Sequence, residues 1–329
     1  MTATLPASRA TPPAAPARPR RTRGRAGQRT RTFYLFVGPW IAGFVLLTLF
    51  PLGYAFWMSL TNTDGLSPNW SYVGLDNYVR VFQDQQTLAS LGRTGIFMLA
   101  TVPTGVAAGL VMAVMLNRDF KGRTLFRALF YLPAVVPGVA AALTFKIIFD
   151  KNAGAANAVV GAAGGEPVSW LADPYTRFVL ILMILWGVGG SMIISLAALQ
   201  DVPRELLEAA KVDGASPAYS FFKITLPLLS PIIFFQVVTG VIGSLQVFVP
   251  SLLLAPVNGP AAVTAVPEGN YLFMVHVYAE YFAKSHFGYA SALLWVLFLF
   301  VLLITGIVFK IGNRAVFYGG VDPTERKEG

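Results

Sequence analysis

The sequence EAAKVDGASPAYSFFKITLP occupies residues 208–227, between two long apolar segments at residues 178–199 and 227–254. Segments of this length and composition suit a bilayer core, which a helix of about 20 apolar residues can cross. The hydrophilic stretch is therefore expected to be a loop that joins two membrane spans. The chain as a whole is expected to be an all-α membrane protein.

Local signals in and just before this loop predict two short helices. Asp201 is expected to cap the first helix, with Pro203 in its opening turn, where a missing N–H costs little. Gly214 can adopt positive φ and end that helix. Ser216 and Pro217 are the residue types expected for the cap and the first position of a second helix.

One face of the first predicted helix is narrow. Leu206, Ala209, Ala210 and Asp213 follow the i, i+3, i+4, i+7 spacing that places residues on one side of a helix. The two alanines keep this face slim enough to enter a groove on a partner.

The loop also contains a longer pattern: Glu-Ala-Ala, three residues, Gly, nine residues, Ile, one residue, Leu-Pro. It resembles the EAA loop of permease subunits of binding-protein-dependent ABC importers of the carbohydrate type. In that family the loop forms a coupling helix that docks onto a cytoplasmic ATPase; the alternative is an ordinary amphipathic surface loop. The resemblance implies that the coupling residues are Glu208, Ala209, Ala210, Asp213, Gly214, Ile224, Leu226 and Pro227.

Composition supports a polytopic membrane protein. Of the 329 residues, 55% are hydrophobic and only 12% are charged, whereas about a quarter are charged in a soluble domain. Residues 1–32 hold eight arginines and no acid, and are expected to be a disordered cytoplasmic tail. Such a tail suits positive-inside orientation and contact with anionic lipid better than nucleic acid binding. The absence of Cys excludes disulfides and thiolate sites, and His276 and His286 are too few for a histidine metal cluster.

Six membrane spans are expected. The first is expected to be kinked or interrupted near Pro51, because proline removes a helical hydrogen bond. The expected permease domain covers residues 33–315, with a core at about 88–310, the EAA loop at 201–227 and a cytoplasmic tail at 316–329. The predicted spans are residues 33–60, 91–116, 125–149, 178–199, 227–254 and 289–309.

Lys and Arg residues are distributed unequally between the two sides of these spans. Nineteen of the 25 lie in the N-terminal tail, around the connection between the second and third spans, in the EAA loop, or at the C-terminal end. The positive-inside rule therefore predicts that both termini and the EAA loop are cytoplasmic. The expected location is the bacterial cell membrane.

The predicted outer loops carry Trp70, Tyr72, Trp170 and Tyr175, which are either interfacial anchors or contacts for an external partner. Further stretches resemble sugar-type permeases, so that the resemblance covers about residues 33–315. One of them, Asn258-Gly259-Pro260, departs from the Gly-Gly-Pro more usual in the family. These stretches are residues 72–78, 154–170, 258–260 with Thr264, and 288–292.

The sequence contains no G-x-x-x-x-G-K-[ST] motif, so the chain is expected to be a non-catalytic subunit whose energy comes from a partner. The predicted spans also lack the mid-membrane carboxylates that secondary carriers use. A carrier or channel working without ATP is the alternative, and a scaffold whose basic tail binds nucleic acid or lipid is a third. No metal is expected.

Small and neutral polar residues in the fourth and fifth spans are candidates for a solute pathway. An uncharged path suits a sugar, and in maltose-type permeases the two spans that flank the EAA loop hold the sugar. The alternative is helix packing, which is the preferred interpretation of the GxxxG at Gly105 and Gly109. The candidate pathway residues are Gly187, Gly190, Gly240, Ser244, Gln246 and Val247.

The resemblance also implies a set of partners. The chain is expected to work with a second permease subunit, two ATPase subunits that use ATP and Mg, and an extracytoplasmic binding protein that delivers a sugar or related solute. No cofactor is expected on this chain, and no nucleic acid.

Overall fold

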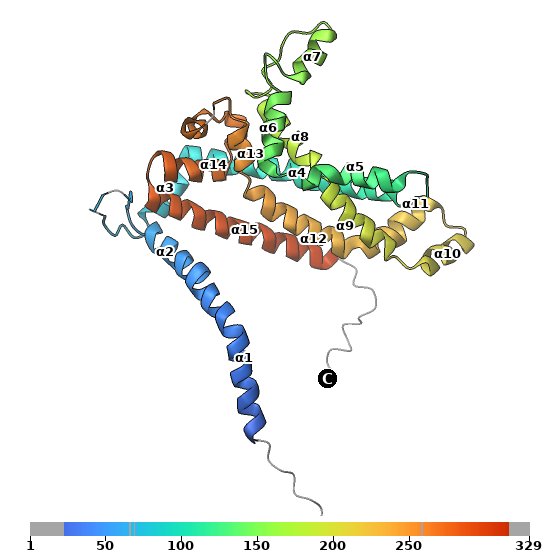
Figure 1. Ribbon diagram of the computed structural model, residues 1–329, viewed down its shortest axis with the longest axis horizontal. Helices are drawn as coiled ribbons and strands as arrows, with labels where there is room; N and C mark the ends of the chain where they lie inside the picture. Colours follow the sequence, from blue (N-terminus) through green and yellow to red (C-terminus); the bar gives the residue numbers. More distant parts are fainter. Residues whose placement is uncertain (1–22, 66, 69, 258, 316–329) are drawn as a thin grey trace, which may run out of the picture. The chain divides into compact units, whose positions relative to one another are not determined.

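The computed structural model describes residues 23–65, 67–68, 70–257 and 259–315, which form helices and loops without a strand. Two compact units are present, Met1–Tyr54 and Ala55–Gly329 (Figure 1). The start of the predicted N-terminal tail, Asn258 and the predicted C-terminal tail lie outside the described residues.

The first unit consists of α1 (Arg23–Phe44), a π-helical turn (Val45–Leu49) and the beginning of α2 (Phe50–Ser59). The helix starts at Arg23, ahead of the boundary expected at residue 32. The π-helical turn directly precedes Pro51, which has no N–H to give to the preceding turn. The helix nevertheless continues over Thr32–Ser59 as one stretch, so the change near this proline is a π-helical turn and not the predicted interruption.

The second unit is built around α4, which contacts α3, α5, α8, α9, α12 and α14. Figure 1 shows α4, α9, α12 and α15 running alongside one another. The helices of this unit are α3 (Asp76–Gln83), α4 (Gln85–Leu116), α5 (Arg123–Val135), α6 (Gly138–Ile148), α7 (Ala155–Ala162), α8 (Thr176–Trp186), α9 (Gly189–Gln200), α10 (Arg204–Val212), α11 (Pro217–Ser220), α12 (Leu226–Leu245), α13 (Val249–Leu253), α14 (Phe273–Tyr278) and α15 (Phe287–Ala315).

Five stretches of the described residues are long and apolar enough to cross a membrane, and six if α5 and α6 form one bent span. This agrees with the predicted six-span helical fold. The five are Thr32–Ser59, Gln85–Leu116, Thr176–Gln200, Pro217–Leu245 and Phe287–Gly312.

Two predicted spans need correction. The third is bent by 96° between α5 and α6, because Val136 precedes Pro137 and takes an extended conformation with ψ 128°. The fifth was expected to run to residue 254, but α12 ends at Leu245. Pro250 lies in the opening turn of the separate helix α13, where proline is favoured.

Glycine allows α4 to pack closely on its neighbours. A Cβ at Gly109 would lie 2.4 Å from the Oγ of Ser191 on α9, and one at Gly240 on α12 would lie 3.2 Å from a methyl of Val102 on α4. The packing role predicted for Gly109 is thus confirmed. Small residues at such contacts are typical of membrane helix interfaces.

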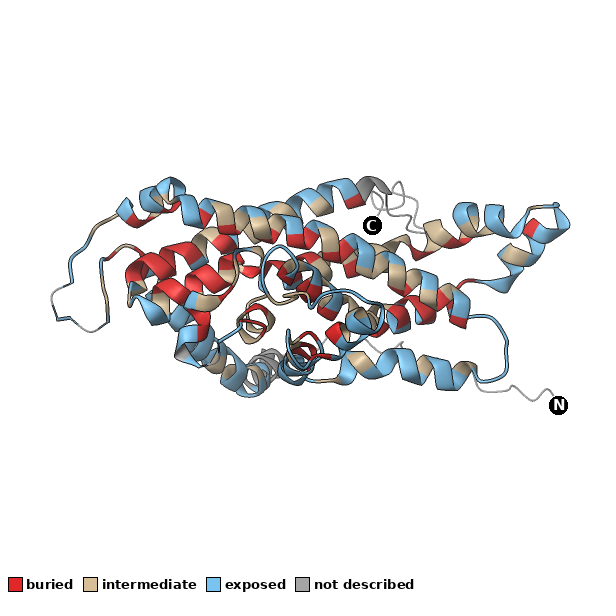
Figure 2. Ribbon diagram, turned by 90° about the horizontal axis from the view of Figure 1, so that it is seen from above, coloured by how far each residue is buried: buried red, intermediate tan, exposed pale blue. Residues whose placement is uncertain are grey.

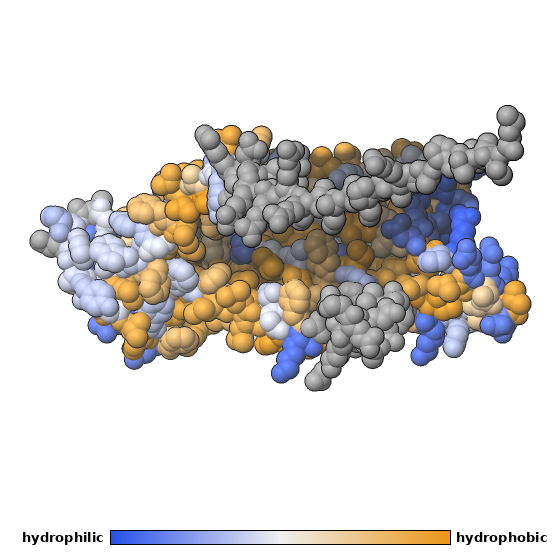
Figure 3. Space-filling view, turned by 90° about the horizontal axis from the view of Figure 1, so that it is seen from below, coloured by the Kyte–Doolittle hydropathy of each residue, from blue (hydrophilic) through white to orange (hydrophobic). Residues whose placement is uncertain are grey.

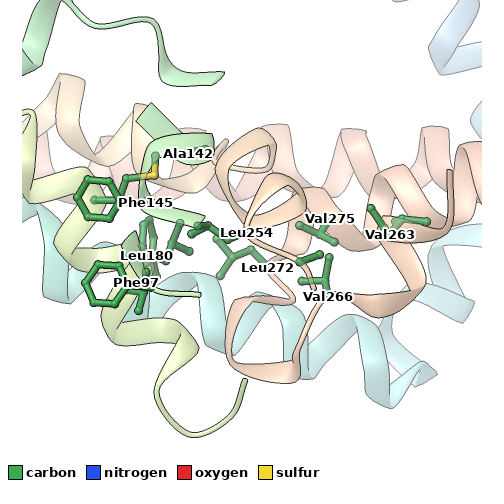
Figure 4. Packing of buried hydrophobic residues seen from close by; sticks show 14 of the residues in the cluster. Phe97, Ala142, Phe145, Leu180, Leu254, Val263, Val266, Leu272 and Val275 are labelled. Atoms are coloured by element: carbon green, nitrogen blue, oxygen red, sulfur yellow. The ribbon is translucent and has the colours of Figure 1, made fainter. Parts of the chain in front are cut away.

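Buried residues line the inward faces of these helices (Figure 2). The largest apolar cluster joins Phe97 of α4 and Leu180 of α8 to Leu254 and Leu272, and includes Phe145 of α6 (Figure 4). Large apolar side chains elsewhere remain exposed. In Figure 3 hydrophobic residues make up much of the surface that grey atoms leave visible between the two ends of the view, as expected for helices that cross a bilayer.

The loop between α6 and α8 has its own internal packing. The indole N–H of Trp170 donates to Asn157 Oδ1 at 2.9 Å, and its ring lies 5.9 Å from that of Phe149. Trp170 therefore has a structural role within this loop.

Candidate functional site

A cavity of about 440 Å³ lies among α4, the junction of α8 and α9, and α12. This volume falls in the range of roughly 300–1,000 Å³ that is usual for ligand pockets. No charged residue is among the side chains that line it. The cavity can therefore accommodate a neutral solute of moderate size against apolar walls with a few polar groups.

Hydroxyl groups in the cavity donate to their own helices. Thr101 Oγ1 donates to the carbonyl of Phe97 at 2.8 Å, and Ser244 Oγ donates to that of Val241 at 3.0 Å. Thr239 Oγ1 donates to a backbone carbonyl in the same way. A hydroxyl oxygen keeps two lone pairs after giving its proton away. These side chains are therefore hydrogen-bond acceptors for a ligand.

A buried amide network links the two helices that flank the loop. Ser191 Oγ donates to Gln236 Oε1, and Gln236 Nε2 donates to Ser195 Oγ at 2.9 Å. The second amide hydrogen of Gln236 remains for another acceptor. Since both Ser191 and Gln236 line the cavity, this network joins α9 to α12 at its wall.

Four of the six predicted pathway residues lie at this cavity, namely Gly187, Gly240, Ser244 and Val247. Gly190 and Gln246 do not line it, and Gln246 is exposed beyond the end of α12. These assignments remain predictions about solute contact.

Sequence reasoning missed the contribution of α4. Phe97, Thr101, Val102, Gly105 and Val106 supply one wall, although the candidates came only from the two spans next to the loop. The spacing of Gly105 and Gly109 was the available signal, because close packing places α4 against both of those spans.

The loop itself forms α10 and α11. The predicted cap is wrong, because Asp201 lies at the C-terminal end of α9, while Pro203 precedes α10 and makes no side-chain cap. Proline disfavours the helical conformation in the residue that precedes it. Val202, which precedes Pro203, therefore separates α9 from α10. Ser216 does cap α11, accepting from the N–H of Tyr219 at 3.2 Å.

Gly214 ends α10 with φ +80°, as predicted. The N–H of Ala215 donates to the carbonyl of Ala210 at 2.9 Å, and that of Gly214 donates to Lys211 at 3.2 Å. These two bonds form a Schellman motif, which satisfies carbonyls at a helix end. The turn is therefore fixed by local hydrogen bonds.

The predicted coupling residues differ in exposure. Ala210 is 9% exposed and is the one buried residue of α10, so it packs on its own chain. Glu208, Ala209, Asp213 and Gly214 are exposed, whereas the three members that follow α11 are partly buried: Ile224, Leu226 and Pro227. The exposed residues of α10 thus form the surface available to a partner, and their coupling role stays a prediction.

A polar cluster far from the loop was not predicted. Thr87 Oγ1 donates to Asp84 Oδ2 at 2.8 Å and lies 2.9 Å from His276 Nε2 and 3.0 Å from the hydroxyl of Tyr289. Since the Thr87 proton goes to the carboxylate, His276 Nε2 is the donor to Thr87. Glu280, 2% exposed, contacts Lys284 Nζ at 2.6 Å and His286 Nδ1 at 2.8 Å, which completes the polar cluster.

The pKa values in the polar cluster favour ionised acids beside a neutral imidazole. Burial raises the pKa of Glu280, but hydrogen bonds from Lys284 and His286 outweigh it and leave the pKa below its usual value. Burial also raises the pKa of Asp84, and hydrogen bonds from Thr87 and the Gln86 N–H bring it below the usual value. Burial lowers the pKa of His276, against the opposing pull of Glu280 and Asp84.

Comparison with known proteins identifies the family of the chain. Residues 105–317 match the family described as "Binding-protein-dependent transport system inner membrane component". The chain is 38% identical over 290 residues to the "Probable ABC transporter permease protein YesP" of Bacillus subtilis, covering 87% of this chain and 91% of the relative.

Two further likenesses extend over most of the chain. It is 33% identical to the "Diacetylchitobiose uptake system permease protein NgcF" of Streptomyces coelicolor, over 99% of this chain and 94% of the relative. The fold matches a chain in the crystal structure of a bacterial ABC transporter involved in the import of the acidic polysaccharide alginate. The TM-score is 0.77 at 23% identity, over 88% of this chain and 98% of that one.

Proposed function

Because the chain belongs to the family of binding-protein-dependent transport system inner membrane components, we propose that it forms part of the translocation pathway of an ATP-driven importer for a sugar or related solute. The uncharged cavity among α4, α8, α9 and α12 carries this proposal. The name of the diacetylchitobiose relative supports the same class of solute.

The cavity has the chemistry that a sugar requires. Sugar hydroxyls donate to acceptor oxygens such as those of Thr101 and Ser244, and the Gln236 amide offers a donor for a ring or hydroxyl oxygen. Phe97 and Val247 supply apolar wall for the carbon face of the ring. Without a lining cation, the cavity disfavours a phosphorylated solute.

The exposed residues of α10 are proposed to couple this cavity to an ATPase. Glu208, Ala209 and Asp213 lie on the outer surface of the helix, and Gly214 fixes its end. The loop lies between α9 and α12, which both line the cavity. Force applied to α10 therefore reaches two walls of the solute pathway through adjacent helices.

The remaining partners follow from the same proposal. A second permease subunit completes the pathway, two ATPase subunits bind ATP and Mg, and an extracytoplasmic binding protein delivers the solute. The distribution of Lys and Arg supports a cytoplasmic location for α10 and for both termini.

The pathway can be tested by a substitution that places a larger side chain in the cavity. Gly243 lines the cavity, and no atom lies within 4 Å of a Cβ built there. In proteoliposomes of the assembled transporter, Gly243→Leu should reduce ATP-dependent solute uptake by at least about tenfold. The leucine side chain would occupy volume in the cavity that the solute needs, and a pocket discriminates even against one extra methylene group.

The matched control is Gly306→Leu on α15, where a Cβ also meets nothing within 4 Å and which does not line this cavity. It should leave uptake unchanged. Normal uptake by Gly243→Leu in a fully assembled complex would show that solute takes another path.

A further inference from the structure

A second hollow lies where several helix ends meet beside α10. It has a volume of about 390 Å³ and is lined by residues of the α4–α5 connection, the start of α5, the end of α9 and the start of α10. Its polar lining comprises Asn117, Asp119, Arg123, Arg127, Gln200 and Arg204. It is separate from the cavity proposed for solute, with which it shares no residue.

The hollow carries net positive charge. Asp119 pairs with Arg123 on the surface, where the Asp119 side chain is almost fully exposed, and exposed ion pairs of this kind contribute little. Arg127 and Arg204 have no carboxylate partner within ion-pair distance among the described residues. Two guanidinium groups therefore remain for an anion.

Arg127 is held in place by one hydrogen bond, but not all of its hydrogen-bond donors have partners. Its Nη2 donates to the carbonyl of Leu116 at 2.8 Å, at the C-terminal end of α4. Its Nε is buried and has no hydrogen-bond partner among the described residues. Because Nε is enclosed, Nη1 and the second hydrogen of Nη2 are the Arg127 donors that remain for phosphate oxygens.

The hollow also lies at the ends of helices that are long and apolar enough to cross a membrane. The spans Gln85–Leu116 and Thr176–Gln200 end beside it, and α5 begins beside it. Along α5, Leu125, Phe126, Leu129 and Phe130 are exposed apolar side chains. A phosphate above an apolar surface is the arrangement of a phospholipid, and basic pockets between helices on the cytoplasmic side bind such headgroups.

We propose that this hollow is a phosphate-binding site, with Arg127 and Arg204 as the main ligands and Asn117 and Gln200 as further donors. The bound group bridges Arg127 of α5 to Arg204, the first residue of α10. Its source is an anionic phospholipid headgroup or a free phosphate, which share the same recognition chemistry.

The test uses the assembled transporter in nanodiscs of phosphatidylcholine with and without phosphatidylglycerol. Native mass spectrometry measures the phosphatidylglycerol retained by the complex, and a titration with inorganic phosphate in pure phosphatidylcholine measures the soluble ligand. The double variant Arg127→Gln/Arg204→Gln should retain at least about tenfold less of the bound ligand, because each lost bond to a charged group weakens binding strongly. Arg118→Gln is the matched control, since Arg118 is exposed in the same connection but does not line the hollow.

Retention of phosphatidylglycerol by the wild type and its loss in the double variant support a lipid headgroup, whereas saturable phosphate binding without lipid enrichment supports a free phosphate. If the double variant does not assemble, Arg127→Lys/Arg204→Lys keeps the charge without the fork and should show an intermediate loss. Equal ligand retention by the wild type and an assembled arginine variant overturns the proposal. Loss of the ATPase subunits with unchanged lipid and phosphate binding also overturns it, and makes the arginines a protein contact.

Discussion

The polar cluster around Thr87 and the helix α10 are held in opposite ways. In the polar cluster, Thr87 and His276 are each 1% exposed, and side chains from α4, α14 and α15 are joined by hydrogen bonds across about 200 residues of sequence. In α10, by contrast, only Ala210 is buried, and the bonds that end the helix come from within five residues.

This difference indicates which region depends on partners. Buried polar groups that are fully hydrogen-bonded specify one arrangement, because leaving any of them unpaired costs free energy. A short exposed helix has little tertiary packing to stabilise it and gains most from docking. Substitutions in the polar cluster should therefore affect folding, and substitutions in α10 should affect assembly and coupling.

The largest effect is expected at Gly288, near the polar cluster. A Cβ there would lie 2.0 Å from the backbone oxygen of Thr61, and backbone cannot move aside as a flexible side chain can. Gly288→Ala should destabilise the chain by more than the roughly 1–3 kcal/mol of ordinary overpacking. Size-exclusion chromatography of the solubilised protein should show loss of the folded peak, while Gly306→Ala on the same helix, where a Cβ meets nothing within 4 Å, should retain it.

The second effect is expected at Gly214, where the comparison predicts a functional rather than a folding defect. Proline cannot adopt φ +80° and would remove the N–H that donates to Lys211. Gly214→Pro should distort the end of α10 at a cost of about 3 kcal/mol, leaving the spans folded but lowering uptake per ATP hydrolysed several-fold.

The control for that change is Gly214→Asn, because asparagine tolerates positive φ and no atom lies within 4 Å of a Cβ at this position. It should keep the ratio of uptake to ATP hydrolysis near the wild-type value. A normal ratio in Gly214→Pro would remove the coupling role of the turn.

A smaller effect is expected from removing one hydroxyl of the polar cluster. Thr87→Val keeps the shape but removes the bond between Thr87 and His276 Nε2, while Tyr289 keeps its bond to Asp84 Oδ2; the expected cost is about 1–3 kcal/mol. The melting temperature of the purified complex should fall. The control is Thr144→Val, which removes an exposed hydroxyl that bonds only its own helix. An equal fall in melting temperature in this control would contradict a stabilising role of the Thr87 hydroxyl in the polar cluster.

The smallest effect is a dependence of stability on pH. Because the pKa of His276 is lowered by folding, the unfolded chain binds this proton first, and stability should fall as pH drops below about 6.5. Asp84 and Glu280 also have lowered pKa values, but their contribution is lost only near and below about pH 4.

His276→Gln keeps a donor for Thr87 without a titratable ring. It should flatten the change in melting temperature between neutral and mildly acidic pH. His286→Gln is the control, because the imidazole that it replaces is 44% exposed. If His286→Gln alone flattens the change in melting temperature with pH, the assignment of this change to His276 is wrong.

Contact with the ATPase can be tested directly because the chain has no cysteine. Ala209 is exposed, whereas Ala210 is buried against its own chain. Ala209→Cys should therefore cross-link to a thiol in the ATPase groove in an ATP-sensitive manner, and Ala210→Cys should react more slowly. Labelling of Ala209→Cys only from outside the cell would reverse the proposed orientation.

Much of the fold could be predicted because its signals are local. Apolar length identified the spans, and Gly214 and Ser216 marked the end and the start of neighbouring helices through backbone preferences that act within a few residues. Asp201 failed as a cap for the same reason, since Pro203 shifted the start of α10 by restricting the residue before it.

The candidate site was only half predictable. Gly240 and Ser244 could be placed by their distance from the loop, but Thr101 and Val102 reach the cavity because α4 packs against α9 and α12. Nothing in the local sequence states which helices are neighbours. The 96° bend between α5 and α6 likewise depends on more than the presence of Pro137, because other prolines lie within helices that continue.

The sequence by itself determined that the chain is a membrane protein of about six helical spans with an EAA-type loop, because length, hydropathy and turn chemistry are properties of short segments. Only the tertiary structure decided that Thr87, His276 and Tyr289 meet, that the cavity has a third wall from α4, and that arginines of α5 and α10 share one hollow. These contacts join residues tens to hundreds of positions apart. Their formation depends on close packing between helices, which no local pattern records.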